Sequence, residues 1–166
     1  MNTDAAARLL ARAETLGLTI ATAESLTGGL VADALVSVPG ASSVFRGGVV
    51  SYATQLKRDL LGIDQGLLAE CGAVDARVAA QMAERVRIVC GGAEAPVSLG
   101  LATTGVAGPA EQDGHPAGEV YLAVATGVET RVQHHRFAGD RESIRSQAPS
   151  AVIELALVTL GQVATE

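Results

Sequence analysis

The chain has 166 residues, which fits a single domain over residues 1–166, and 48% of them are hydrophobic. It contains two Phe, two Tyr and no Trp, so the core must be built mainly from aliphatic side chains. The formal net charge of −6 argues against a nucleic-acid partner, and the lack of a long apolar run argues against a secretory signal or a membrane partner. We therefore expect a soluble, cytoplasmic protein.

The two cysteines, Cys71 and Cys90, have neither a Cys-x-x-Cys spacing nor a companion His. This pattern predicts two reduced, partly buried thiols and no metal site.

Hydrophobic periodicity divides the chain into alternating helices and strands. Apolar residues at helical spacing predict a helix from about Asp4 to Leu16, and a β-branched run from Thr19 predicts a buried strand. That strand turns directly into a helix that Pro39-Gly40 ends. The elements expected after it are a strand over Arg46–Tyr52, helices over Ala53–Leu61, Ile63–Cys71 and Asp75–Gly91, strands over Val97–Thr103, Glu119–Thr126 and Thr130–Phe137, and a helix from Asp140 or Ser143 to about Val163.

This order predicts an α/β fold: a three-layer α/β/α sandwich with a mixed, mostly parallel five-stranded sheet. The final helix is apolar nearly all round from Ala151 to Leu160, so it should be deeply buried or packed against another subunit.

The turn after the first strand, Glu24-Ser25-Leu26-Thr27-Gly28-Gly29, is the strongest candidate site. It would place Ser25 at the carboxyl edge of the sheet, and backbone N–H groups at the following helix N-terminus would attract an anion. A nucleophile and an anion-binding turn would then share one segment. From the residues alone, the alternative that Ser25 is an ordinary turn or capping residue is the stronger one, and Glu24 could serve only to orient the turn.

Two further segments should reach the same edge of the sheet. Tyr52 ends the second predicted strand and Lys57 follows it; the simpler interpretations are a half-exposed aromatic and a solvated charge. The long loop Thr104–Gly118 contains Gly105 and Gly108, which free the backbone to offer N–H groups to an anion, although an ordinary surface turn would look the same.

Arg141 and Arg145 are four residues apart on the last predicted helix, so they share a face suited to phosphate or carboxylate binding. Ion pairing with Glu142 is the alternative. The histidines fit no catalytic or metal arrangement and are expected to be surface residues: His115, His134 and His135.

Taken together, several motifs resemble the CinA C-terminal domain family, in order from about residue 5 to 160. They are Ala23-Glu24-Ser25-Leu26-Thr27-Gly28-Gly29, Pro39-Gly40-Ala41-Ser42, Phe45-Arg46-Gly47-Gly48-Val49-Val50-Ser51-Tyr52, Leu60-Leu61-Gly62, Gly72-Ala73-Val74, Thr104-Gly105-Val106-Ala107-Gly108-Pro109 and Gly139-Asp140-Arg141-Glu142-Ser143-Ile144-Arg145. The chain is similar to the stand-alone form of the family, without the molybdopterin-binding-like domain that precedes it in longer members.

The resemblance implies a nicotinamide-nucleotide amidase of α/β/α fold that forms a homodimer or higher homo-oligomer. Such an enzyme converts nicotinamide mononucleotide and water to nicotinate mononucleotide and ammonia. By the family pattern Ser25 is the nucleophile, and Tyr52 and Lys57 are its activating partners, with the base left open between them. Leu26, Ala53-Thr54 and Ala110-Glu111 depart from residues that are common in the family, which bears on substrate preference more than on chemistry.

An acyl transfer of this kind needs no metal and no organic cofactor, because a serine ester intermediate can divide the barrier into two steps. The residues expected to bind the substrate come from three segments: Glu24, Thr27, Gly28, Gly29, Thr104, Gly105, Gly108, Arg141 and Arg145. The alternatives are a non-catalytic nucleotide-binding or scaffolding domain with the same pocket, and a different amidase or phosphate-ester hydrolase.

Overall fold

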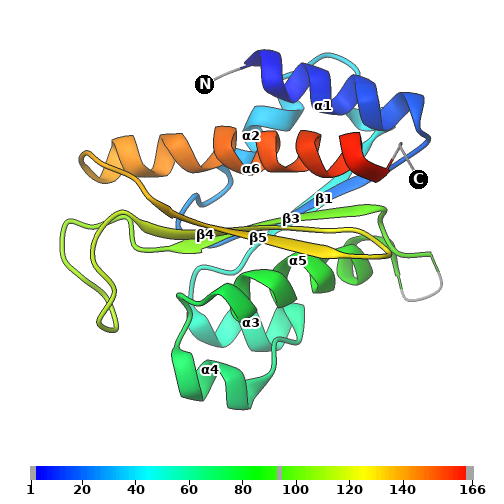
Figure 1. The fold of residues 1–166 in the computed structure, drawn as a ribbon. Coiled ribbons are helices and arrows are strands. Elements are labelled where there is room, and N and C mark those ends of the chain that lie inside the picture. The colour runs from blue at the N-terminus through cyan, green and yellow to red at the C-terminus, as the bar shows by residue number, and fades with distance from the viewer. Residues whose placement is uncertain (1–2, 93–94, 164–166) are drawn as a thin grey trace.

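The computed structural model describes residues 3–92 and 95–163, which contain a five-stranded sheet in the order β2-β1-β3-β4-β5 (Figure 1). β1 is parallel to both of its neighbours, whereas β3–β4 and β4–β5 are antiparallel. The sheet is therefore mixed, as predicted, and it is open, with its parallel part at the β2 end. The strands are β1 (Ile20–Glu24), β2 (Phe45–Val50), β3 (Leu99–Gly105), β4 (Glu119–Ala125) and β5 (Thr130–Arg136).

Helices cover both faces of the sheet, which confirms the predicted three-layer sandwich (Figure 1). One layer holds α1, α2 and α6, and the opposite layer holds α3, α4 and α5. The helices are α1 (Thr3–Thr15), α2 (Leu30–Val36), α3 (Thr54–Leu61), α4 (Gln65–Cys71), α5 (Ala76–Gly91) and α6 (Arg141–Val163), with a short 3-10 helix at Ala41–Ser43. No helix in the described ranges is long and apolar enough to cross a membrane.

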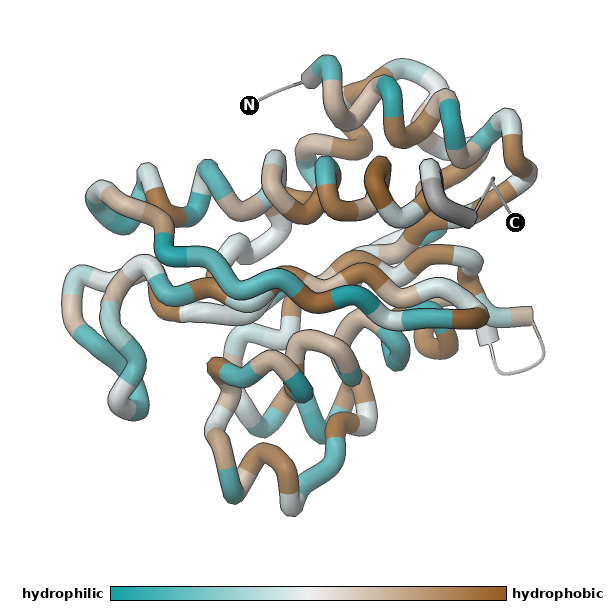
Figure 2. Tube along the Cα trace, viewed as in Figure 1, coloured by the Kyte–Doolittle hydropathy of each residue, from teal (hydrophilic) through white to brown (hydrophobic). Residues whose placement is uncertain are grey.

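The core consists of two aliphatic clusters, one on each side of the sheet. Leu9, Leu101 and Val152 belong to the cluster under α1 and α6, and Met82 and Ala102 belong to the cluster over α5. In Figure 2 the outermost strand β5 is largely hydrophilic, in contrast to the hydrophobic strands behind it. Because the sequence has few aromatic side chains, aliphatic residues, many of them alanines, fill the space between the helices and the sheet.

Element bounds differ from the predicted ones mainly around the candidate site. β3 continues through Thr104 and Gly105, which pair with Tyr121 and Val120 of β4, so these two residues belong to the strand and not to the loop. Pairing with β4 was not visible in the sequence of this segment, because Thr-Thr-Gly has the composition of a turn.

The sheet brings the ends of three parallel strands together at one edge. Ser25 directly follows β1, Tyr52 follows β2 by two residues, and Gly105 ends β3. Since carboxyl ends of neighbouring parallel strands meet at the same edge, the fold places these three segments beside one another. The candidate site lies at this edge.

Candidate active site

A cavity of about 270 Å³ opens at the carboxyl edge of the parallel strands. Its walls come from the β1–α2 turn, the end of β2, the glycine-rich segment after β3 and the start of α6. Among the residues that line it are Ser25, Leu26, Tyr52, Thr104, Gly105 and Arg141. Three segments expected from the sequence to converge therefore do share one cavity.

Ser25 and Lys57 form a buried pair at this cavity. The Nζ atom of Lys57 donates a hydrogen bond to Ser25 Oγ at 2.9 Å and another to the carbonyl oxygen of Ser51 at 2.7 Å. Lys57 belongs to α3 and is fully buried, and Ser25 is also buried. Lys57 is the only lysine in the chain. Lysines are almost never fully buried without a partner, so its burial points to a specific role.

Burial lowers the pKa of Lys57 from its ordinary value of 10.5 to about 8. Water is excluded from the ammonium group, and the protein offers it two neutral oxygen acceptors in place of a carboxylate. About a tenth to a fifth of the amine is consequently neutral between pH 7 and 7.4. In that form Lys57 can accept the proton of Ser25, which is the requirement for a general base.

Tyr52 lies at the outer rim of the cavity and has a different partner. Its side chain is 55% exposed, and its hydroxyl accepts a hydrogen bond from Arg141 Nη2 at 2.7 Å. Arg141 Nη1 also donates to the carbonyl oxygen of Gly108 at 2.8 Å. Of the two candidate bases, Lys57 thus contacts Ser25 directly, whereas Tyr52 is tied to the arginine and the glycine-rich segment.

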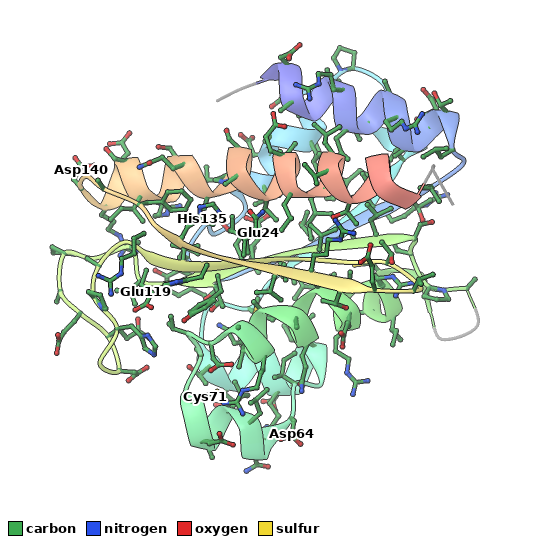
Figure 3. The ribbon with its side chains drawn as sticks, in the orientation of Figure 1. Glu24, Asp64, Cys71, Glu119, His135 and Asp140 are labelled. Carbon is green, nitrogen blue, oxygen red and sulfur yellow. The ribbon has the colours of Figure 1, made fainter. Side chains whose placement is uncertain are left out.

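Glu24 does not line the cavity, contrary to the predicted role in substrate binding. Its carboxylate accepts hydrogen bonds from the backbone N–H groups of Gly29, Val31 and Ala32, at 2.9, 3.1 and 2.8 Å. Figure 3 shows Glu24 pointing between the sheet and the helical layer that contains α6. The helix N-terminus predicted to bind a substrate anion is therefore occupied by an anion of the chain itself, which satisfies the free amides of α2.

The other residues of the turn also face the fold. Thr27 is fully buried, and its hydroxyl shares a hydrogen bond of 2.7 Å with the hydroxyl of Thr103. Gly28 and Gly29 adopt positive φ angles of 61° and 105°, which favour glycine, and they reverse the chain here. Neither residue lines the cavity. The predicted substrate contacts of Thr27, Gly28 and Gly29 are replaced by structural contacts that hold the turn.

Arg145 does not line the cavity either. Its Nε donates to the carbonyl oxygen of Leu26 at 2.9 Å, and its Nη2 donates to that of Thr27 at 3.0 Å. The two arginines of α6 thus have different contacts: Arg141 reaches the cavity rim, and Arg145 binds the β1–α2 turn on the side away from the cavity lining.

The glycine-rich segment contributes a wall in which side chains would not fit. A Cβ atom at Gly105 would overlap the carbonyl oxygen of Glu119, and one at Gly108 would lie 2.8 Å from Cβ of Ala117. Thr104 lines the cavity and donates its hydroxyl to the carbonyl oxygen of Ala73 at 2.6 Å. Close packing, and not only conformational freedom, therefore explains the glycines here.

Beside this segment lies a cluster that the sequence did not indicate. Glu119 accepts hydrogen bonds from His115 Nδ1 at 3.1 Å and from His134 Nε2 at 2.9 Å, and His134 stacks on Tyr121. Glu119 lies at the base of the loop in Figure 3. His134 is exposed and His115 is partly buried, so both lie at the surface as predicted, but each also binds a buried carboxylate. The antiparallel pairing of β4 and β5 brings His134 beside Glu119, and the loop before β4 brings His115 there.

Cys71 and Cys90 are free and partly buried, as predicted. Burial raises the pKa of both thiols, which keeps them in the unreactive protonated form. In the described part of the chain, no group of His, Cys, Asp and Glu is arranged to hold a metal ion.

Comparison with known proteins gives one consistent result. The family model described as the CinA C-terminal domain matches residues 2–160. A CinA-like protein from Frankia casuarinae is 49% identical over 137 residues, which cover 82% of this chain and 30% of that protein. A CinA-like protein from Geobacter sulfurreducens is 48% identical over 131 residues, covering 78% and 30%. This chain thus spans about 30% of the length of these relatives.

Solved structures agree in fold over almost the whole chain. A CinA superfamily protein from Klebsiella pneumoniae has a TM-score of 0.91 at 29% identity and covers 98% of this chain and 99% of its own. A competence/damage inducible protein from Agrobacterium tumefaciens has a TM-score of 0.87 at 33% identity, covering 96% and 94%. Since sequence and fold match from end to end of the domain, this chain belongs to the CinA C-terminal domain family.

Proposed function

We propose that the chain is an amidohydrolase that converts nicotinamide mononucleotide and water to nicotinate mononucleotide and ammonia, with Ser25 as nucleophile and Lys57 as general base. The observation that carries this proposal is the buried hydrogen bond of 2.9 Å between Lys57 Nζ and Ser25 Oγ, together with the lowering of the Lys57 pKa to about 8. A serine next to a partly neutral lysine is an established solution for acyl transfer.

In the first step Ser25 Oγ attacks the carboxamide carbon, and its proton passes to the neutral amine of Lys57. The C–N bond then breaks, and the leaving nitrogen takes that proton from Lys57 and departs as ammonia. A water molecule attacks the resulting ester with Lys57 again accepting a proton, and Ser25 leaves as the restored hydroxyl. Every proton transfer occurs between the substrate, water, Ser25 and Lys57.

The oxyanion of each tetrahedral intermediate needs a hydrogen-bond donor. The N–H of Ser25 already donates to the carbonyl oxygen of Thr103 at 3.0 Å, so it is occupied. The next N–H along the chain is that of Leu26, a residue that lines the cavity, and among the described residues it has no acceptor. We assign the oxyanion to Leu26 N–H; losing one such donor typically costs about 3 kcal/mol of transition-state stabilisation.

The remaining walls suit the two ends of the nucleotide. Val74 and Val106 give the cavity apolar surface, on which the pyridine ring would lie. Arg141 supplies a positive charge at the rim, and within the described residues no carboxylate neutralises it, so this charge would attract the phosphate.

Replacing the nucleophile tests the proposal. Ser25→Ala should reduce ammonia release from nicotinamide mononucleotide by about 10⁴-fold or more, because covalent catalysis is lost as a unit. The protein should still fold, since the change removes one hydroxyl. Ser42→Ala, at an exposed serine of the 3-10 helix, is the matched control and should be fully active.

Undiminished turnover by Ser25→Ala would refute the assignment of the nucleophile. A wild-type protein that is thermally stabilised by pyridine nucleotides but releases no ammonia would instead be a nucleotide-binding domain without turnover. A panel of small amides and phosphate esters, with ammonia and phosphate assayed in parallel, distinguishes the proposed activity from that of a different hydrolase.

A further inference from the structure

The guanidinium of Arg145 binds the backbone of the β1–α2 turn and no carboxylate of the described residues. The residue is partly buried on α6, and its guanidinium donates to two consecutive backbone carbonyls, those of Leu26 and Thr27. Within the described ranges it forms no ion pair with a carboxylate. A cation that is partly withdrawn from water and bound only to backbone oxygens costs desolvation energy, so its placement calls for an explanation beyond charge pairing.

The turn itself continues the hydrogen bonding from Arg145 toward the cavity. Arg145 Nη2 donates to the carbonyl of Thr27, and the N–H of the same peptide group, that of Gly28, donates to the carbonyl of Ser25 at 3.1 Å. The N–H on the other side of that second peptide group is the N–H of Leu26. Two peptide groups therefore connect the guanidinium in series to the N–H assigned to the oxyanion.

Peptide planarity gives this series a defined direction. In a trans peptide the N–H points opposite to the C=O, so fixing the carbonyl of Ser25 fixes the direction of the Leu26 N–H. The second contact, from Arg145 Nε to the carbonyl of Leu26, fixes the direction of the next peptide group, Leu26–Thr27. Hydrogen bonds in series also polarise one another, and a positive charge at one end makes the N–H at the other end a stronger donor.

We propose that Arg145 is a positioning residue of the proposed hydrolase: through the Thr27–Gly28 and Ser25–Leu26 peptide groups it orients and polarises the Leu26 N–H that stabilises the oxyanion. This inference rests on the proposed function. It assigns to the two arginines of α6 separate effects, because Arg141 contacts the rim where substrate binds and Arg145 contacts only the turn. Loss of Arg145 should accordingly lower kcat, while loss of Arg141 should raise KM.

A serine-directed fluorophosphonate tests the inference without depending on the identity of the substrate. Ser25 Oγ forms a bond to phosphorus, fluoride leaves, and the serine proton passes to Lys57, while the phosphoryl oxygen takes the position of the oxyanion. Labelling of Ser25 is followed by intact mass against pH for the wild type, Arg145→Gln and Arg145→Lys. Arg12→Gln, an exposed arginine on α1, serves as the matched control.

We expect Arg145→Gln to be labelled about 10- to 100-fold more slowly than the wild type at every pH, with the midpoint of its pH profile unchanged near the Lys57 pKa of about 8. Arg145→Lys, which keeps the charge but not the two-pronged geometry, should be intermediate. With nicotinamide mononucleotide the same order should appear in kcat, and KM should stay within about threefold. Arg12→Gln should match the wild type.

Equal labelling rates for the wild type and Arg145→Gln would overturn the inference and leave the proposed function standing. A slower rate accompanied by a shifted midpoint would also overturn it, because the change would then act on the Ser25–Lys57 pair and not on the oxyanion donor. Failure to label Ser25 in the wild type would remove the proposed function and the inference together. Melting temperatures of all four proteins identify a variant that is slow because it is unfolded.

Discussion

The cavity has an inner and an outer polar pair, and they differ chiefly in access to water. The inner pair, Ser25 and Lys57, is buried, and the lysine has no exposed surface at all. In the outer pair, Tyr52 is 55% exposed and is bound to an exposed arginine, Arg141. The two hydrogen bonds have similar lengths, 2.9 and 2.7 Å, so distance does not distinguish the pairs.

Burial gives the inner pair a chemistry that the outer pair lacks. It lowers the pKa of Lys57 to about 8, within reach of neutral pH, whereas a solvated lysine would stay protonated. The outer pair keeps a permanent positive charge on the arginine and offers it to solvent and ligand. We infer that the inner pair transfers protons and that the outer pair binds and orients. Four experiments test this division.

The largest effect is expected from Lys57→Met, which keeps the volume and removes the amine. The rate of ammonia release should fall by about 10²–10⁴-fold, the usual contribution of a general base. The wild-type rate should rise with pH through about 8, as the amine of Lys57 becomes neutral. Arg58→Met, at the next and exposed position of α3, is the control. If Lys57→Met retained most of the activity with the same pH profile, the inner pair would not be the proton-transfer site.

The same lysine should make stability depend on pH. Its pKa is about 8 in the folded protein against 10.5 in the ordinary, solvated state, so between these values the unfolded chain binds more protons. The free energy of unfolding should therefore rise as pH increases from 8 to 10.5, by up to about 3 kcal/mol from this group. Denaturant unfolding of the wild type and of Lys57→Met across this range isolates the contribution. Parallel curves would show that burial does not perturb the amine.

Arg141→Gln should act on binding. Removing the positive charge at the rim should raise KM for nicotinamide mononucleotide by about 10-fold, the range for losing a charge-assisted hydrogen bond, with a smaller change in kcat. Nicotinamide without the phosphate provides the control substrate, because it has no anionic group for Arg141 to bind. A fall in kcat with unchanged KM would assign the arginine to the chemical step instead.

The smallest effect is expected from Tyr52→Phe. The change removes a hydroxyl that is exposed and hydrogen-bonded to Arg141, so kcat/KM should fall by less than about 10-fold, mainly through KM. Steady-state kinetics on the purified variant measures this. A loss as large as that of Lys57→Met would show that the phenol takes part in proton transfer and that the outer pair belongs to the chemistry.

The overall fold and the location of the cavity could be predicted because they depend on patterns that the sequence contains directly. The β-branched run before Glu24 and the glycine-rich runs near Tyr52 and Gly105 mark strands and their ends, and parallel strands bring such ends to one edge. Ser25 and Tyr52 were placed at this edge by that reasoning, and Arg141 was proposed from its position on the last helix; all three line the cavity.

Side-chain direction could not be predicted in the same way. Glu24 and Arg145 were expected among the substrate-binding residues, but the carboxylate caps α2, in line with the alternative that Glu24 orients the turn, and the guanidinium binds the turn from behind. The contact of His115 and His134 with Glu119 depends on the register of two antiparallel strands and a loop. Sequence spacing indicates which segments meet, whereas rotamers and register decide which atoms do.

The full burial of Lys57 also restricts the route of its proton. The ε-amine contacts one backbone oxygen and Ser25 Oγ, and its aliphatic stem is enclosed by the protein. A proton that reaches this amine returns through the cavity, by way of the atoms that react there. In the proposed reaction, the acid and base functions of the lysine would therefore be coupled within one turnover: the departing ammonia would carry away the proton that the serine released, and the lysine would again be neutral for the incoming water.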